Sequence, residues 1–237
     1  MRQAAYHRSP EPGRLGSAST GIGASCPAGG SLRSGVPAAT LSAVLRTRTA
    51  GLHEQTEILL GLPGAIRTLA DYRDWLGRFL GLYDPLEKSL ASFSEWGDHG
   101  FTLPSPDHGT CLAADLVALR VDPAKVSRAP PSLLAHPPTF AHALGALYVL
   151  EGSTLGGQVI LRDVQARIGP QITGATRFFG GRGTAVGPTW QTFKIVLDAF
   201  GRERPDLATD VISGAEDVFR AILAWFAPFR PVTESRP

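Results

Sequence analysis

Residues 147–160 read LYVLEGSTLGGQVI and lie inside a longer segment, Thr139 to Ile168, whose apolar residues recur at three- and four-residue steps. This spacing predicts one long helix that begins just after Pro137-Pro138. Each interior glycine costs a helix roughly 0.5–1 kcal/mol relative to alanine. The glycines of this stretch therefore need a compensating contact, and they are Gly152, Gly156 and Gly157.

Tyr148, Gly152 and Gly156 are spaced four apart, so the predicted helix places them on one face. Two glycines there leave a strip of bare main chain beside an aromatic ring. A ligand could lie directly against those peptide groups. A close helix–helix crossing through small residues explains the same spacing, and the pattern alone leaves both explanations open.

The composition bounds the class of protein. The chain has 237 residues, of which 43% are hydrophobic and 19% are charged, which is ordinary for one soluble globular domain. The net charge of +2, with no Lys/Arg stripe interleaved with aromatic residues, argues against a nucleic-acid partner. No apolar run approaches the roughly 18–20 residues of a spanning helix, so no membrane partner is expected.

The cysteines and the two ends of the chain complete this outline. With only Cys26 and Cys111, no disulfide framework is indicated, and a cytoplasmic location is expected. Residues 1–37, rich in Gly, Ser, Pro and Arg, are predicted to be a disordered tail, with an organelle presequence as the alternative. The predicted domain covers residues 38–230, and residues 231–237 form a short C-terminal tail.

The first core helix is predicted to start at Leu41 and to end before Pro63. One of its faces carries a cation, two hydroxyls, an imidazole and a carboxylate at steps of three or four: Arg46, Thr49, His53, Thr56 and Glu57. An imidazole in such a helix is either an ordinary interior or surface group or a metal ligand. The residues alone do not choose between these roles.

Further helices are expected along the rest of the chain. Asp71 is a candidate N-cap for an aromatic-rich second helix. Trp96 to Gly109 is predicted to be a loop, and Asp122 to Ala135 a Pro-rich connection. No strand pair is recognisable, so the predicted fold class is all-α. The remaining predicted helices are Cys111–Arg120, Thr189–Phe200 and a last helix opened by Pro205.

Several stretches of the chain resemble a known family. Residues 146–160 resemble the distal-helix signature of heme oxygenases, in the bacterial branch often found beside bacteriophytochromes. Residues 45–57, which read LRTRTAGLHEQTE, resemble the proximal helix that carries the axial histidine of that family. Phe178-Phe179-Gly180 and Phe193-Lys194 follow in the expected order, and the resemblance spans about Leu41 to Phe229.

The resemblance implies a single-domain helical bundle with heme b between a proximal helix and a glycine-bent distal helix. His53 would bind the iron, and Arg46 and Lys194 would pair with the heme propionates. Thr49 and Tyr148 would also contact heme. The resemblance assigns the distal, catalytic side to Gly152, Ser153, Gly156 and Gly157. Ser153 stands where animal enzymes carry an aspartate, and Asp198 stands where they carry a cation, so proton delivery and propionate pairing depart from the animal pattern.

The implied activity is a heme oxygenase that opens heme with O2 and external electrons to give biliverdin, carbon monoxide and ferrous iron. Its partners would be heme, O2, an electron-donor protein or small reductant, and a bacteriophytochrome as bilin acceptor. The Ser153 departure keeps a heme-binding carrier or sensor without turnover as the alternative. A helical interaction protein, whose glycines serve packing alone, is a third hypothesis.

Overall fold

The computed structural model of this chain describes residues 39–104 and 107–229, so the two predicted tails lie outside the described residues. Within those ranges every regular element is a helix, which confirms the all-α prediction. The α-helices are α1 Leu41–Leu60, α2 Leu69–Leu90, α3 His108–Ala118, α4 Phe140–Ile168, α5 Arg177–Gly180, α6 Val186–Glu203 and α7 Ala208–Phe226. The short 3-10 helices are η1 Gly97–His99, η2 Pro123–Lys125, η3 Gly169–Ile172, η4 Gly183–Ala185 and η5 Pro205–Leu207.

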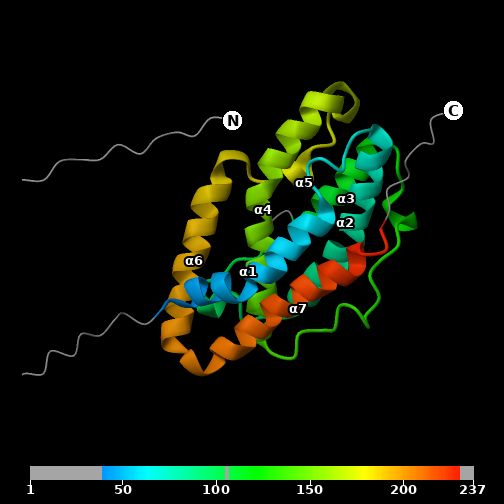
Figure 1. Cartoon of the computed structure of the whole chain (residues 1–237). Coiled ribbons are helices and arrows are strands. Elements are labelled where there is room, and N and C mark those ends of the chain that lie inside the picture. Colours follow the sequence, from blue (N-terminus) through cyan, green and yellow to red (C-terminus); the bar gives the residue numbers. More distant parts are fainter. Residues whose placement is uncertain (1–38, 105–106, 230–237) are drawn as a thin grey trace, which may run out of the picture. The chain divides into compact units, whose positions relative to one another are not determined.

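Helix α4 runs through the middle of the domain and packs against α7, α5 and α6 (Figure 1). Thr139 caps its start, because the side-chain oxygen of Thr139 accepts a hydrogen bond from His142 N at 3.1 Å. By length and composition, the segment Phe140–Ile172 could cross a membrane, but 56% of its apolar window is buried inside the domain. That burial is expected of the core helix of a globular fold.

The crossing of α4 and α7 is built from two glycines. A Cβ added to Gly145 of α4 would meet the Val211 carbonyl of α7. A Cβ added to Gly214 of α7 would meet the His142 carbonyl of α4. The two backbones therefore touch directly, with no side chain between them, and this close approach is the reason for glycine at both positions.

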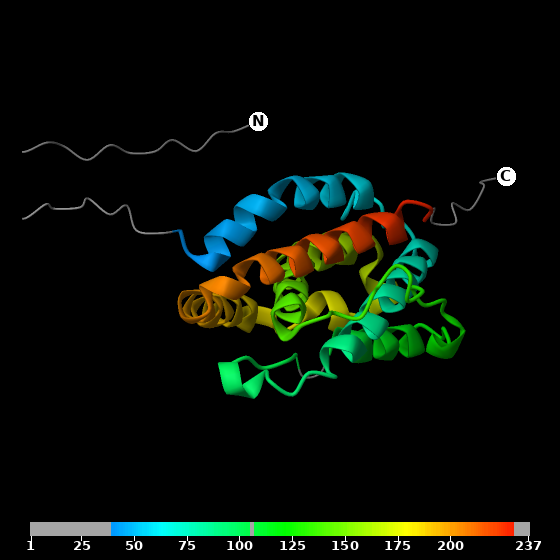
Figure 2. The same cartoon turned by 90° about the horizontal axis from the view of Figure 1, so that it is seen from below.

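Helix α1 lies along α7, and α6 meets its N-terminal end (Figure 2). Asp198 of α6 accepts hydrogen bonds from Ser42 N at 2.8 Å and Ser42 Oγ at 3.0 Å, so it joins α6 to the first turn of α1. One turn and a half further on, Arg48 pairs with Glu216 of α7 at 3.0 Å. Helix α1 ends at Gly61, whose φ of 60° favours glycine.

The second helix starts earlier than predicted, and Asp71 is not its N-cap. Thr68 is the N-cap, since its hydroxyl accepts from Asp71 N at 3.0 Å while the Asp71 carboxylate accepts from Thr68 N at 2.9 Å. This reciprocal capping box places the acidic residue three positions inside the helix. The carboxylate also accepts from Arg67 N, so the side chain that looked like a cap satisfies two backbone donors ahead of it.

Pro85 lies inside α2 and has no N–H to donate to the Gly81 carbonyl four residues earlier. Ala129 N donates to that carbonyl instead, at 2.8 Å. A Cβ on Gly81 would meet the Ser127 carbonyl and the Trp225 ring, so glycine is needed for this approach. The Gly81 carbonyl, to which Pro85 cannot donate, is therefore the point where the Pro-rich connection attaches to α2.

Two helix starts are held by buried carboxylates. Asp115 of α3 accepts from the backbone N–H groups of Arg177 and Phe178 at 3.0 and 2.9 Å, which fixes the start of α5. Glu87 of α2 accepts from the backbone N–H groups of His108 and Gly109 at 2.9 and 2.8 Å, which fixes the start of α3. Helix α3 therefore begins at His108, inside the segment that the sequence predicted to be a loop.

The Gly145–Gly214 crossing generates a prediction. Gly145→Ala forces a methyl group into the α7 backbone, and overpacking of this kind costs about 1–3 kcal/mol. At the roughly 2–4 °C per kcal/mol of a domain of this size, we expect the melting temperature of the protein, followed by circular dichroism, to fall by roughly 2–12 °C. Gly51→Ala is the matched control, because a Cβ at that helical position meets no described atom within 4 Å and should raise stability. An unchanged melt for Gly145→Ala would contradict the direct backbone contact.

Candidate functional site

The structure brings three of the predicted site residues together where α1 passes α4. Burial raises the pKa of Tyr148, and the positive charge of Arg46 and a hydrogen bond with Thr49 partly offset that rise. Thr49 is itself buried, and its hydroxyl donates to the Leu45 carbonyl at 2.8 Å. The charged head of Arg46 and the phenol of Tyr148 therefore lie at the junction of the two helices.

One face of α4 continues from Tyr148 toward the helix C-terminus, and we call it the open face: Gly152, Leu155, Gly156 and Val159. Leu155 and Val159 are 43% and 59% exposed and lie one turn apart, so they form a small apolar strip beside the two glycines. Apart from its chain neighbours and the adjacent backbone of α4, no atom of residues 39–104 or 107–229 comes within 4 Å of a Cβ built on Gly156. A Cβ on Gly152 would make ordinary contact with the Trp190 ring at 3.6 Å.

The glycines of α4 therefore divide into two groups. Gly145 and Gly157 are packing glycines, because an added Cβ would press on Val211 of α7 in the first case and on the Phe179 carbonyl at 2.8 Å in the second. Gly152 and Gly156 face no neighbouring backbone in the described part of the chain. Helix packing thus explains Gly157 and leaves the other two glycines unexplained, so the structure does not group Gly157 with the open face.

His53 lies one turn beyond Thr49 on α1. Its side chain is 59% exposed, and its ring contacts Phe219 of α7 edge-on at a centroid distance of 5.9 Å. The Nδ1 atom is 3.6 Å from the Glu57 carboxylate, one turn on. A carboxylate on that side favours a proton on Nδ1, which leaves Nε2 with the lone pair that a metal ligand needs.

Helix α6 contributes a cation and an indole. Lys194 Nζ is 5.8 Å from the centroid of the Trp190 ring, within cation–π range. That ring stacks on Phe193 at 5.6 Å and contacts Tyr148 at 5.4 Å. The indole therefore connects Lys194 to the Tyr148 face of α4. The sequence carries no signal for this contact, because a large aromatic residue at helical spacing is typical of a core position.

Asp198 of α6 does not take part in the arrangement of Lys194, Trp190 and Tyr148. Both of its carboxylate oxygens bond to Ser42 in the first turn of α1, so it fixes the helix that carries His53. A carboxylate near a helix N-terminus also interacts favourably with the helix dipole. The acidic replacement at this position therefore has a structural role in this chain.

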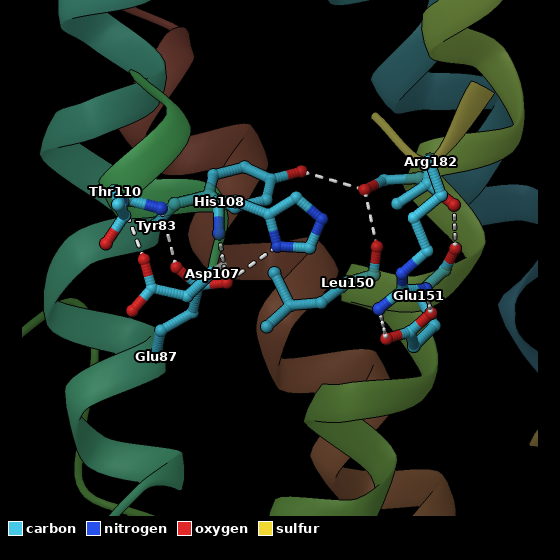
Figure 3. A network of polar contacts seen from close by, with 11 residues as sticks. Tyr83, Glu87, Asp107, His108, Thr110, Leu150, Glu151 and Arg182 are labelled. Atoms are coloured by element: carbon cyan, nitrogen blue, oxygen red, sulfur yellow. Dashed lines mark hydrogen bonds and ion pairs between the residues drawn. The ribbon is translucent and has the colours of Figure 1, made fainter. Parts of the chain in front are cut away.

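A buried ion pair lies beside the glycines and was not anticipated. Glu151 is 4% exposed and makes a two-pronged contact with Arg182 at 2.8 and 3.2 Å (Figure 3). This contact raises the pKa of the Arg182 guanidinium. It attaches the loop after α5 to the residue that precedes Gly152. The sequence did hold a signal, since a lone carboxylate inside the apolar run LYVLEG needs a partner.

Ser153 and Thr154 bond to their own helix. Ser153 Oγ donates to the Leu150 carbonyl and Thr154 Oγ1 to the Glu151 carbonyl, both at 2.7 Å. Hydroxyls that bond back to carbonyls of the preceding turn bend helices. Figure 1 shows α4 changing direction along its length. Tyr83 of α2 lies 2.9 Å from Ser153 Oγ, so a second helix reaches this turn.

Two cavities among the described residues lie away from these side chains. The larger, of about 460 Å³, is lined by the 133–138 connection with parts of α4 and α7, and the smaller, of about 290 Å³, lies by Arg78 and Trp225. Neither is lined by His53 or by the open face. Within the described ranges, no group of three or more His, Cys, Asp or Glu side chains could hold a metal ion. A metal bound at His53 would need ligands from outside the protein.

Comparison with known proteins agrees with this arrangement. Residues 39–228 match the family model described as heme oxygenase. The chain therefore belongs to the heme oxygenase family, whose members are heme-degrading oxygenases. A search of curated proteins found no match to this chain.

The residues present fit heme. An imidazole with a free Nε2 suits iron, and a porphyrin supplies the remaining nitrogen ligands itself. Bare backbone at Gly152 and Gly156 can accept a flat ring that a Cβ would push away, and exposed Leu155 and Val159 offer it apolar contact. Arg46 and Lys194 are cations of the kind that pair with carboxylates.

The ion pair beside the open face generates a prediction. Arg182→Ala leaves the Glu151 carboxylate buried without its partner, and we expect a loss of about 2–3 kcal/mol of stability in urea unfolding, at the low end because Arg182 is one-third exposed. Arg177→Ala is the matched control, since Asp115 keeps two backbone donors there. Glu151→Gln should recover part of the loss in the Arg182→Ala background. Equal losses for both arginines would contradict this account.

Proposed function

We propose that this protein cleaves heme with O2 and external electrons to biliverdin, carbon monoxide and ferrous iron. The observation that carries the proposal is the open face, an apolar strip of α4 with bare backbone at Gly156 and no neighbouring atom of the described chain within 4 Å of a Cβ there. Apolar side chains left in water on a core helix favour a ligand that covers them. Heme is the family's substrate.

The residues of α1, α4 and α6 around the site have separate tasks in this proposal. His53 Nε2 would hold the iron from α1, with Glu57 orienting the ring. Arg46 and Lys194 would pair with the propionates and so select which porphyrin edge meets the distal side. Gly152 and Gly156 would keep side-chain atoms away from the distal side. Bound heme supplies the iron that activates O2 and the ring that is opened.

The same proposal includes the protein's setting. The likeness of residues 146–160 to the bacterial branch supports biliverdin as a chromophore for a bacteriophytochrome, with a cytoplasmic electron-donor protein or small reductant. Co-expression with a bacteriophytochrome apoprotein tests this link. A bilin-type absorption band in the phytochrome, dependent on this chain, is the expected result.

Addition of hemin to the purified protein tests the function itself. We expect a shifted Soret band that disappears on addition of ascorbate or a reductase, with biliverdin as the extracted product. A heme carrier or sensor would keep a stable band under reductant. A helical interaction protein would give no shifted band, and either result would overturn the proposal.

His53→Ala should abolish turnover and weaken hemin binding, because it removes the nitrogen that binds iron. The helical circular dichroism should not change, since the side chain is largely exposed and alanine is a better helix former. His136→Ala is the matched control, because that imidazole contacts Ser89 and Phe93 away from α1. Biliverdin formation at the wild-type rate by His53→Ala would exclude His53 as the ligand.

Gly156→Ala separates a ligand role from a packing role. Without heme, the methyl group meets open space, so the apo-protein should gain up to about 1 kcal/mol of stability. With heme bound, the same methyl group should press on the ligand and lower the rate of biliverdin formation. Gly51→Ala should give the same gain in stability with an undiminished rate. Reduced apo stability together with full turnover would contradict the ligand role of the open face.

A further inference from the structure

Tyr83 is a buried residue to which the proposed function assigns no task. Its ring lies edge-on to Phe79, Phe178 and His108, with centroid distances of 6.1, 5.5 and 5.3 Å. Three rings around the phenol restrict its direction, and its hydroxyl meets Ser153 Oγ at 2.9 Å. Ser153 follows Gly152 directly in α4. A residue of α2 is thus held against the turn of α4 that contains Gly152 and Ser153, which we call the distal turn.

The ring of His108 that supports Tyr83 is itself fixed. His108 Nδ1 lies 2.6 Å from Glu87 Oε1, and the other carboxylate oxygen accepts from Gly109 N at 2.8 Å. Figure 3 shows the imidazole between Glu87 and the Tyr83 side chain. Glu87 is 8% exposed, and both of its carboxylate oxygens accept hydrogen bonds from backbone N–H groups at the start of α3. The support behind Tyr83 is therefore rigid.

The direction of each hydrogen bond follows from counting protons. A serine hydroxyl has one proton and two acceptor positions. The proton of Ser153 is committed to the Leu150 carbonyl at 2.7 Å. Of the two hydroxyls 2.9 Å apart, Tyr83 must therefore be the donor to Ser153. One acceptor position remains on Ser153, and no other described hydrogen bond uses it.

Tyr83 keeps its proton under all ordinary conditions. Burial raises the pKa of its phenol to about 12, and the Glu87 charge adds to the rise. Two carboxylates with protein partners flank this turn: Glu87, which contacts His108, and Glu151, which pairs with Arg182. Tyr83 is thus a permanent hydrogen-bond donor and a poor source of protons.

We propose that Tyr83, supported by the Glu87–His108 pair, is a positioning residue that holds the Ser153 hydroxyl on the Leu150 carbonyl. Ser153 then offers the distal side of bound heme a hydrogen-bond acceptor and no proton. This inference rests on the proposed function. Ser153 would then orient a water molecule, which donates a hydrogen bond to it, and would not itself deliver a proton.

The hemin complex of the full chain provides the test, through the pH midpoint at which its visible spectrum changes from the acid to the alkaline form. A hydrogen-bond acceptor at Ser153 stabilises the acid, protonated form of the hemin complex. Ser153→Ala should therefore lower the midpoint by about half to one pH unit, the equivalent of one hydrogen bond. Tyr83→Phe should lower it similarly, because the released hydroxyl can turn and donate.

The double variant makes the test specific. If Tyr83 acts through Ser153, Tyr83→Phe should have no further effect on the midpoint in the Ser153→Ala background. Melts of the same apo-proteins should show losses that do not add. Tyr72→Phe is the matched control, because it removes an equally buried α2 hydroxyl that bonds to the Ala175 carbonyl at 2.7 Å, and it should leave the midpoint unchanged.

The outcomes separate the two proposals. A hemin complex whose midpoint rises in Ser153→Ala, or still falls with Tyr83→Phe when Ser153 is absent, overturns the positioning role alone. Tyr83→Phe with an unchanged midpoint but slower turnover would identify a proton relay through the phenol and would also overturn it. Failure of the wild-type protein to form any hemin complex overturns the proposed function, and the inference with it.

Discussion

The direct contact between the α4 and α7 backbones at Gly145 and Gly214 is the constraint on which the rest of the structure depends. Helix α7 carries α1 through the Arg48–Glu216 pair and the contact of Phe219 with His53. The closeness of α4 to α7 therefore determines how far the His53 helix stands from the open face. A side chain at either glycine would move α7 and, with it, the imidazole. The distance that matters for a ligand between α1 and α4 is set at a crossing that no ligand touches.

A single helix carries glycines for two opposite reasons. At Gly145 and Gly157 a neighbouring backbone occupies the space of the missing side chain, whereas at Gly156 no described atom does. Spacing cannot distinguish these cases, because both place small residues on a helix surface at steps of about four. The two cases differ in whether the backbone of another segment lies beside the glycine. The exposed side chains of Leu155 and Val159 show that the open face is also apolar. A flat, apolar ligand needs both properties.

Periodicity and the resemblance together predicted the all-α class, the family and the long glycine-bearing helix, and these are confirmed. The starts of α3 and α5 were harder to predict from the sequence, because they depend on side chains from other helices. Glu87 holds the start of α3, and Asp115 holds that of α5. The partners of the distal turn could not be predicted for the same reason. Tyr83 looks like one more member of an aromatic stripe, and only the folded chain places its hydroxyl on Ser153. The roles of the heme-facing residues stay predictions.

The Gly81–Pro85 arrangement has a consequence for how the domain moves. The connection between α3 and α4 contains only η2 as a regular element, and such a segment would ordinarily open and close independently of its surroundings. Here Ala129 N takes the place of a missing helical donor, so releasing the connection leaves a carbonyl in the interior of α2 without a partner. The amide of Ala129 should therefore exchange its hydrogen with solvent on the timescale of α2 and not on that of a loop. We therefore expect the part of the connection around Ala129 to open together with α2 as one cooperative unit.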